Sequence, residues 1–141
     1  MRSFLARFGS RGQAEERPTS LFRRKASVAR LLRAENVALL ALALAAYWQV
    51  GGSWWLFAIL FFAPDLSFAA AVAGPLAGLV AYNIAHAAII PGLLAVFGIV
   101  ANWDLGVSLA VIWIAHLAFD RTVGYGLKYS LAKNDTHLDR I

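Results

Sequence analysis

Four ionisable side chains lie inside a long apolar stretch of this 141-residue chain: Asp65, His86, His116 and Asp120. The stretch holds no lysine or arginine between Arg33 and Arg121. A charged side chain near the centre of a bilayer costs about 2.5–3.5 kcal/mol on insertion scales, so such residues are rare unless they are compensated or functional. Carboxylates and imidazoles are also the ligands of catalytic zinc and non-haem iron. These four residues are therefore the candidate functional site.

One hypothesis for these residues is a divalent-metal centre, with zinc, iron or manganese as the candidate ions. Asp65, His86 and His116 supply one carboxylate and two imidazoles, which leaves a coordination position for water. In this hypothesis Asp120 is a fourth ligand or the carboxylate that orients His116. A metal ion in such a site activates water for hydrolysis, here of a lipid-like or membrane-delivered substrate. The chain has no HExxH sequence, so the spacing of these residues does not identify an enzyme class.

The spacing places these residues on common helix faces. Asn83 and His86 are three residues apart. His116 and Asp120 are four residues apart, and both separations bring side chains together on a helix. At 1.5 Å per residue, Asp65, Asn83, His86 and His116 lie roughly 9–15 Å from the inner ends of their helices. Three helices are thus predicted to present polar groups at overlapping depth.

Three other interpretations of the same residues stay open. In a structural one, Asp65 pairs with a histidine and Asn83 bridges two helices. Asp120 then pairs with Arg121 or Lys128. In a transport interpretation the groups relay protons or small solutes, although the outer half lacks the polar residues of a complete path. In the third, the protein is a non-enzymatic accessory subunit that docks on a larger membrane complex or on a second copy of itself.

The composition indicates a membrane protein. Hydrophobic residues make up 60% of the chain and charged residues 15%, which is outside the usual soluble range. The absence of cysteine excludes disulfides and thiolate metal sites. All thirteen basic residues lie within positions 1–33 or 121–141, so both termini are expected in the cytoplasm, against anionic headgroups of the lipid bilayer. Because membrane contact explains these residues, nucleic-acid binding is not expected.

Turn residues divide the apolar region into four segments, each long enough to cross roughly 30 Å of hydrocarbon. The segments are 36–50, 54–73, 76–100 and 105–122. Pro64 is expected to break the second segment beside Asp65. Short connections make sequential helices antiparallel neighbours. The predicted fold is an all-α membrane protein, a compact up-down four-transmembrane-helix bundle with a basic cytoplasmic N-terminal tail.

This organisation predicts three regions. They are a basic cytoplasmic tail or surface helix (1–34), the four-helix transmembrane bundle (35–123) and a cytoplasmic C-terminal segment (124–141). Tryptophans are expected together at the outer interface, as in an aromatic belt. These are Trp48, Trp54, Trp55 and Trp103.

Four sequence blocks together resemble a family of short bacterial integral-membrane proteins that is catalogued as a domain of unknown function. The blocks are YWQVGGSWWLFAILFFAPDLSF (47–68), YNIAHAAIIPG (82–92), WIAHLAFDRTVGYGLKY (113–129) and DTHL (135–138). The family's recurring polar residues map here onto Asp65, Asn83, His86, His116, Asp120, Arg121, Asp135 and His137. The resemblance implies a bacterial cytoplasmic (inner) membrane location and no established activity. Asn83, Arg121, Asp135 and His137 are therefore taken as supporting residues, the last two on a segment expected to fold back toward the site.

Overall fold

The computed structural model describes residues 18–130, 135, 136 and 138, with side chains from residue 26 onward. The regular elements within this part are helices, and an isolated antiparallel bridge joins Lys128 to Thr136. In chain order the helices are α1 (Pro18–Val50), α2 (Trp54–Leu60), the 3₁₀ helix η2 (Ala63–Ala73), α3 (Pro75–Ala85), α4 (Ile89–Val100) and α5 (Asp104–Val123). The predicted all-α class is confirmed.

Three stretches of the described chain are long and apolar enough to cross a membrane. They are Trp54–Ala73, Pro75–Val100 and Asp104–Val123, close to the second, third and fourth segments predicted from the sequence. The first predicted segment, 36–50, is the C-terminal part of α1, which runs without interruption from Pro18. The described part of the basic tail, from residue 18, is thus continuous with the helix that follows it.

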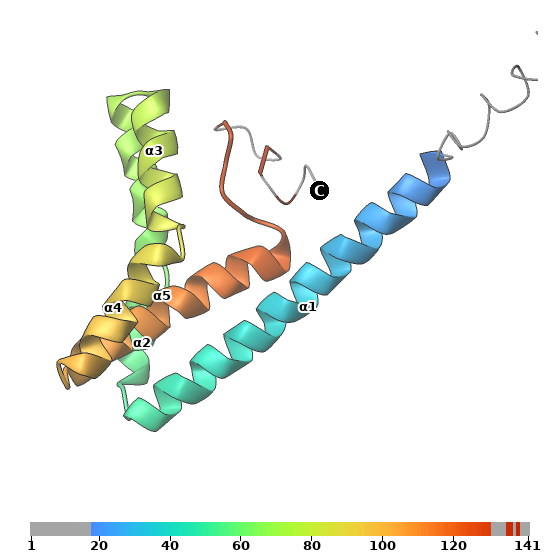
Figure 1. The fold of residues 1–141 in the computed structure, drawn as a ribbon. Helices are drawn as coiled ribbons and strands as arrows, with labels where there is room; N and C mark the ends of the chain where they lie inside the picture. Colours follow the sequence, from blue (N-terminus) through green and yellow to red (C-terminus); the bar gives the residue numbers. More distant parts are fainter. Residues whose placement is uncertain (1–17, 131–134, 137, 139–141) are drawn as a thin grey trace, which may run out of the picture.

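The chain alternates in direction between two ends of the molecule (Figure 1). The turns that follow α1 and α4 lie at one end, and the turn between η2 and α3 lies at the other. Gly51, Asn102 and Gly74 occupy these turns with positive φ angles of 70°, 52° and 128°, a conformation that glycine and asparagine tolerate best. Trp48 and Trp54 lie at the first of these turns, with ring centroids 6.3 Å apart, and Trp103 lies at the turn that follows α4.

Helix α5 is the centre of the packing. It contacts both α1 and α4, and half of its apolar window is buried, against 6% and 17% for the other two candidate spans. Small residues allow this close approach, and Ala43 of α1 packs with Ala115 of α5 in the buried core. In contrast, η2 and α3 lie side by side and form a separate arm (Figure 1). The candidate residues lie on both parts: Asp65 on η2, His86 at the end of α3, and His116 and Asp120 on α5.

Two helix breaks shape the second and third apolar stretches. Pro64 has no N–H to donate to the carbonyl of Leu60, where α2 ends, so the predicted break is confirmed. The second break was not predicted: residues 86–88 separate α3 from α4. Its cause is Pro91, which cannot donate to the carbonyl of Ala87. Broken helices at membrane depth occur where they line a buried site or a cavity.

Gly98 is expected to be essential for packing α4 against α5. A Cβ atom at this position would lie 2.8 Å from the backbone nitrogen of Val107. Gly98→Ala should therefore force the helices apart and lower the free energy of unfolding by about 1–3 kcal/mol. The matched control is Gly92→Ala on the same helix, where an added Cβ meets nothing within 4 Å. Denaturant titration in mild detergent measures both, and equal stability of the two variants would contradict the observed close approach.

Candidate functional site

Each candidate residue reaches the site from a distinct structural position. Asp65 lies in the first turn of η2, directly after the break at Pro64. His86 is the C-terminal cap residue of α3, at the second break. His116 and Asp120 lie one turn apart on α5. The two breaks and the central helix thus bring residues from three apolar stretches to one place.

The four side chains converge on a common point. The Nε2 atom of His86 lies 3.6 Å from Oδ1 of Asp65 and 3.4 Å from Oδ2 of Asp120. The Nε2 atom of His116 lies 3.7 Å and 3.5 Å from the same two oxygens. The two Nε2 atoms are 3.3 Å apart, and every pair of the four ligand atoms lies within 4.8 Å.

These separations match the ligand shell of a single metal ion. Around a tetrahedral ion with bonds of about 2.0–2.2 Å, ligand atoms lie about 3.3–3.6 Å apart. Four of the five separations between histidine nitrogens and their neighbours lie in this range, and the fifth, 3.7 Å, is just above it. Apart from the contact between the two imidazoles, they are longer than good N–H···O hydrogen bonds of 2.7–3.2 Å. The arrangement is therefore closer to a coordination shell than to a directly hydrogen-bonded set.

His86 is held in the orientation that a metal ligand needs. Its Nδ1 atom lies 2.9 Å from the carbonyl oxygen of Tyr82, and an Nδ1–H that donates there leaves the Nε2 lone pair facing the cluster. The Tyr82 ring stacks on the imidazole with centroids 3.8 Å apart and planes 17° apart. A backbone carbonyl on the distal nitrogen is a common partner of metal-bound histidines, where it selects the tautomer.

His116 is held mainly by packing. It is buried, and Phe61 meets its imidazole edge-on at a centroid distance of 5.4 Å. Its Nδ1 atom makes no hydrogen bond of good geometry with the described residues. The backbone of Phe61 is nevertheless close enough to interact electrostatically with the imidazole. The Oδ2 atom of Asp120 lies near both His86 and His116. This position agrees better with the predicted role of Asp120 as a fourth ligand than with a carboxylate that orients His116 alone.

Charge balance distinguishes the cluster from an ordinary ion pair. Two carboxylates lie within 4.8 Å of one another, and no Lys or Arg among the described residues forms an ion pair with either. The structural interpretation placed Arg121 or Lys128 against Asp120, and that pair is absent from the described residues. Like charges so close together raise each other's free energy in a low-dielectric setting. A divalent cation or two protonated imidazoles would balance them.

The supporting residues predicted from the sequence occupy different places. Asn83 holds the C-terminal segment: its Nδ2 donates to the carbonyl of Lys128 and its Oδ1 accepts from the Lys128 N–H, both at 2.8 Å. Arg121 lines a small cavity together with His86 and Asp120. The Asp135 carbonyl accepts the Tyr129 N–H, and its carboxylate is not part of the cluster.

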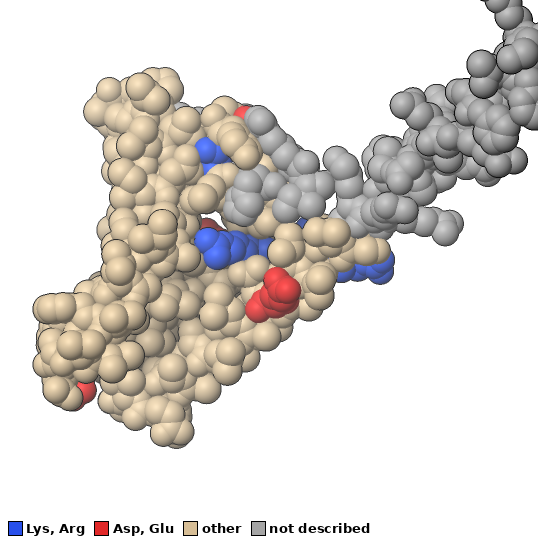
Figure 2. All heavy atoms as spheres, viewed as in Figure 1, with Lys and Arg blue, Asp and Glu red and all other residues tan. Residues whose placement is uncertain are grey.

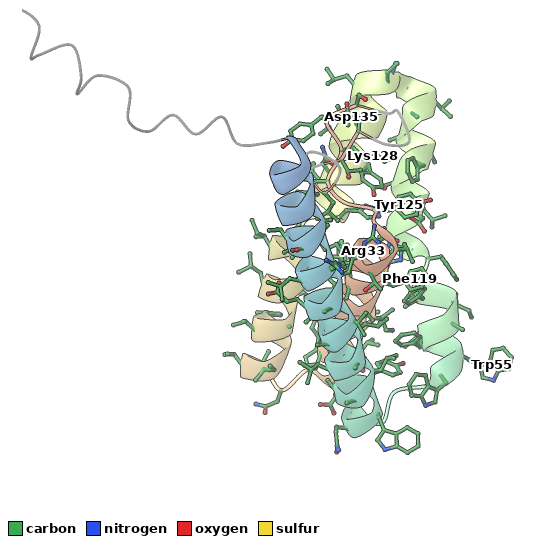
Figure 3. The ribbon with its side chains drawn as sticks, turned by 90° about the vertical axis from the view of Figure 1, so that its right-hand side faces the viewer. Arg33, Trp55, Phe119, Tyr125, Lys128 and Asp135 are labelled. Carbon is green, nitrogen blue, oxygen red and sulfur yellow. The ribbon has the colours of Figure 1, made fainter. Side chains whose placement is uncertain are left out.

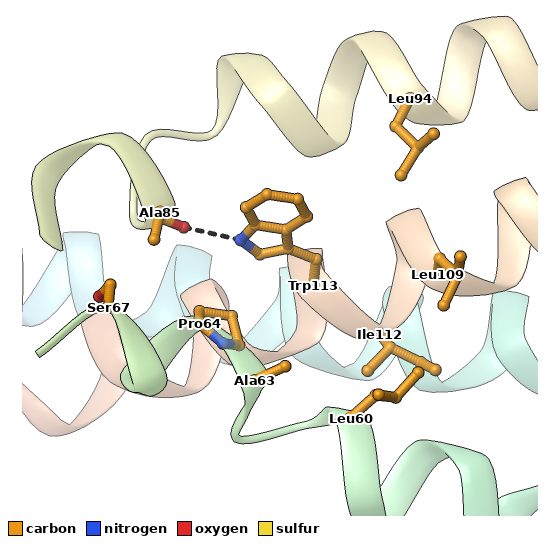
Figure 4. Close-up of a pocket in the computed structure, with 9 residues that line it drawn as sticks. All are labelled: Leu60, Ala63, Pro64, Ser67, Ala85, Leu94, Leu109, Ile112 and Trp113. Carbon is orange, nitrogen blue, oxygen red and sulfur yellow. Dashed lines mark hydrogen bonds between the residues drawn. The ribbon is translucent and has the colours of Figure 1, made fainter. Parts of the chain in front are cut away.

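His137 lies outside the described residues, so its predicted contribution stays a prediction. Two other residues were not selected from the sequence. Tyr82 supports His86, and its hydroxyl donates to the carbonyl of Gly126 at 3.3 Å. Trp113 donates from Nε1 to the carbonyl of Ala85 at 2.7 Å, which satisfies an acceptor freed where α3 ends (Figure 4). The sequence offered one signal for the role of Tyr82: it lies four residues, or one helical turn, before His86.

Two larger cavities lie in this region, and residues of the cluster line the second of them. One, of about 350 Å³, is apolar and lies between the two helix breaks and α5, where Pro64, Ala85 and Trp113 contribute to its wall (Figure 4). The other, of about 360 Å³, is more polar and is referred to below as the aromatic cavity. It is lined by Phe62, Asp65, Phe68, Tyr82, His116, Phe119, Asp120, Tyr125 and Lys128.

The cluster opens toward the aromatic cavity. The Asp65 side chain is 40% exposed, whereas that of Asp120 is 15% exposed and both histidines are almost completely buried. Asp65, His116 and Asp120 all contribute to the cavity wall. Figure 2 shows Lys and Arg side chains beside a hollow on the face between the arm and α1, while the outer side of the arm is uncharged in this view. A small molecule could therefore approach the cluster from this side.

Comparison with known proteins identifies a family but no activity. A family model described as "Domain of unknown function (DUF4260)" matches residues 29–141. No curated protein matches the chain, and no solved structure matches it.

Proposed function

Since the chain belongs to this family of undefined function, we propose its function from the geometry of the site: it is a membrane metalloprotein that binds one divalent cation. Asp65, His86, His116 and Asp120 are the ligands. The observation that carries the proposal is the convergence of four ligand atoms within 4.8 Å of one another, with two carboxylates that no lysine or arginine of the described chain neutralises. Two imidazoles and two carboxylates suit zinc, iron or manganese.

The chemistry proposed for this site is hydrolysis. A divalent cation bound here would need a fifth coordination position for water; it would lower the pKa of that water and polarise a carbonyl or phosphoryl oxygen of the substrate. The residues of the chain contribute the rest: Tyr82 orients His86, the buried core around His116 keeps the ligand set rigid, and the more exposed Asp65 faces the cavity through which a substrate enters. The substrate is a molecule delivered from the membrane.

The proposed setting is a bacterial cytoplasmic membrane. In it α1 forms a fourth span beside the three apolar ones, and both termini face the cytoplasm because the basic residues flank the apolar region. His116 lies seven residues before Val123, the end of α5, or about 10 Å from that end at 1.5 Å per residue. The metal centre then lies in the cytoplasmic half of the membrane.

Metal analysis of the full-length protein tests the proposal. The protein is purified in mild detergent without chelators or a metal-affinity step, and its zinc, iron and manganese are measured by inductively coupled plasma mass spectrometry. We expect about one ion per chain. Asp104→Asn is the matched control, because Asp104 is an exposed carboxylate at the opposite end of α5, and it should leave the metal content unchanged.

A metal-free protein that still folds would overturn the proposal. Circular dichroism of the same sample establishes whether the helices are intact. The accessory-subunit interpretation would then be preferred, with the apolar arm as its contact surface, since Leu66, Val72 and Leu76 on that arm are 74%, 95% and 73% exposed.

A further inference from the structure

The aromatic cavity has one cation that the metal centre does not use. The Nζ atom of Lys128 lies 4.7 Å from the ring centroid of Phe68 and 4.9 Å from that of Tyr82. It forms no ion pair with any described carboxylate, although Asp65 and Asp120 line the same cavity. Cation–π contacts stabilise an ammonium group without neutralising its charge. Lys128 is therefore a charged group that is free to bind an anion.

The backbone of Lys128 is fixed from a distant part of the chain. Asn83 binds both its N–H and its carbonyl, and the Tyr82 hydroxyl binds the neighbouring carbonyl of Gly126. The bridge to Thr136 adds a third restraint. The same turn of α3 thus positions Lys128 and supports His86. This places the ammonium group and the metal ligands on the walls of one cavity.

The rim of this cavity is aromatic and exposed. Phe62, Phe68 and Phe119 lie on apolar stretches and are 60%, 42% and 40% exposed. Tyr125 follows α5 and is 40% exposed; aromatic residues of this kind concentrate at the membrane interface. In Figure 3 Phe119, Tyr125 and Lys128 succeed one another along one face of the molecule, in keeping with their common place on the cavity wall. A ligand with hydrocarbon chains could enter sideways through this rim.

We propose that the aromatic cavity binds the phosphate head of an anionic membrane lipid between Lys128 and the metal centre. A volume of about 360 Å³ lies within the range of small-molecule pockets, about 300–1,000 Å³. The head lies against the ammonium group of Lys128, and the chains pass the phenylalanine rim into the bilayer. The proposal deepens the proposed function and rests on it for the metal ion, which a phosphate oxygen of the head would coordinate.

Lipid binding to the full-length, metal-loaded protein in detergent tests this proposal. Three probes are compared by isothermal titration: dioctanoyl phosphatidate, dioctanoylglycerol, which has the same chains without phosphate, and inorganic phosphate. The expected order is that phosphatidate binds at least about tenfold more tightly than either of the others, because only phosphatidate makes both the charge-assisted and the apolar contacts.

Two variants separate the charge of Lys128 from its packing. Lys128→Met keeps most of the side-chain stem and should weaken phosphatidate binding about tenfold, whereas Lys128→Arg keeps the charge and most of the affinity. Arg30→Ala is the matched control, since Arg30 is an exposed cation on α1 that does not line the cavity. Dioctanoylglycerol binding should be unaffected by all three substitutions.

Several outcomes overturn the proposal. These are equal affinities for phosphatidate and dioctanoylglycerol, an unchanged affinity in Lys128→Met, and inorganic phosphate that binds as tightly as the lipid. Metal content is measured in the same samples. Protein that contains the metal but lacks the phosphatidate preference refutes the lipid site alone. Metal-free protein that keeps a Lys128-dependent preference refutes the metal centre and its part in lipid binding, and leaves Lys128 as the group that binds the phosphate.

Discussion

Replacing His116 with alanine is expected to lower the affinity for zinc by at least about 100-fold. The imidazole supplies one of four converging ligand atoms, and it is buried, so no solvent-exposed side chain can take its place. Structural zinc sites with four protein ligands bind with about 10–16 kcal/mol, so the loss of one ligand is expected to remove several kcal/mol. Competition with a chromophoric chelator measures the change in affinity.

The control for this prediction disturbs the apolar packing of α5 and leaves the ligands intact. Leu117→Ala, at the adjacent buried position, should reduce stability without a comparable loss of zinc affinity. If both variants lose zinc to the same extent, the effect of His116→Ala is one of folding. If neither loses it, His116 is not a ligand.

Tyr47→Ala is expected to produce the largest loss of stability, about 3–5 kcal/mol. Tyr47, near the end of α1, is completely buried, and its ring contacts those of Trp54 and Phe57 on α2 at centroid distances of 5.3 and 5.0 Å. Its hydroxyl also donates to the carbonyl of Ser53 at 2.7 Å. Truncation would leave a cavity and remove this hydrogen bond. Denaturant titration in detergent gives the free energy of unfolding.

Tyr47→Phe separates the two contributions. It keeps the ring and removes only the hydroxyl, so its cost should be about 0.5–1.5 kcal/mol, that of one hydrogen bond, because Ser53 is exposed and its carbonyl still accepts the N–H of Phe57. A Trp55→Ala variant provides the surface control, since Trp55 is 81% exposed near the same turn (Figure 3). A Tyr47→Ala protein as stable as Trp55→Ala would contradict the packing described for this end of α1.

Much of the helical organisation could be predicted from local signals. Gly51 and Gly74 lie at the predicted turns, and Pro64 breaks its helix because it lacks an N–H, as expected. The interruption at 86–88 could not be foreseen in the same way. Pro91 lies five residues after His86 in an unbroken apolar run, and a proline there could equally have kinked a continuous helix.

The candidate site was predictable only in part. Residue types and depth were enough to select Asp65, His86, His116 and Asp120, because ionisable groups are rare in an apolar stretch. The role of Asn83 was not predictable, because its partner Lys128 is 45 residues away in the sequence. The position of Lys128 in the aromatic cavity was not predictable either. Its neighbours Phe68 and Tyr82 belong to η2 and α3, and only their tertiary packing brings the three together.

X-ray absorption spectroscopy at the zinc edge tests the metal centre most directly. On the zinc-loaded, full-length protein the account predicts four or five nitrogen and oxygen ligands at about 2.0–2.2 Å, outer-shell scattering from two imidazoles, and no sulfur. The contradictory result is a spectrum of six oxygen ligands without imidazole scattering, which would mean that zinc binds outside the cluster of Asp65, His86, His116 and Asp120.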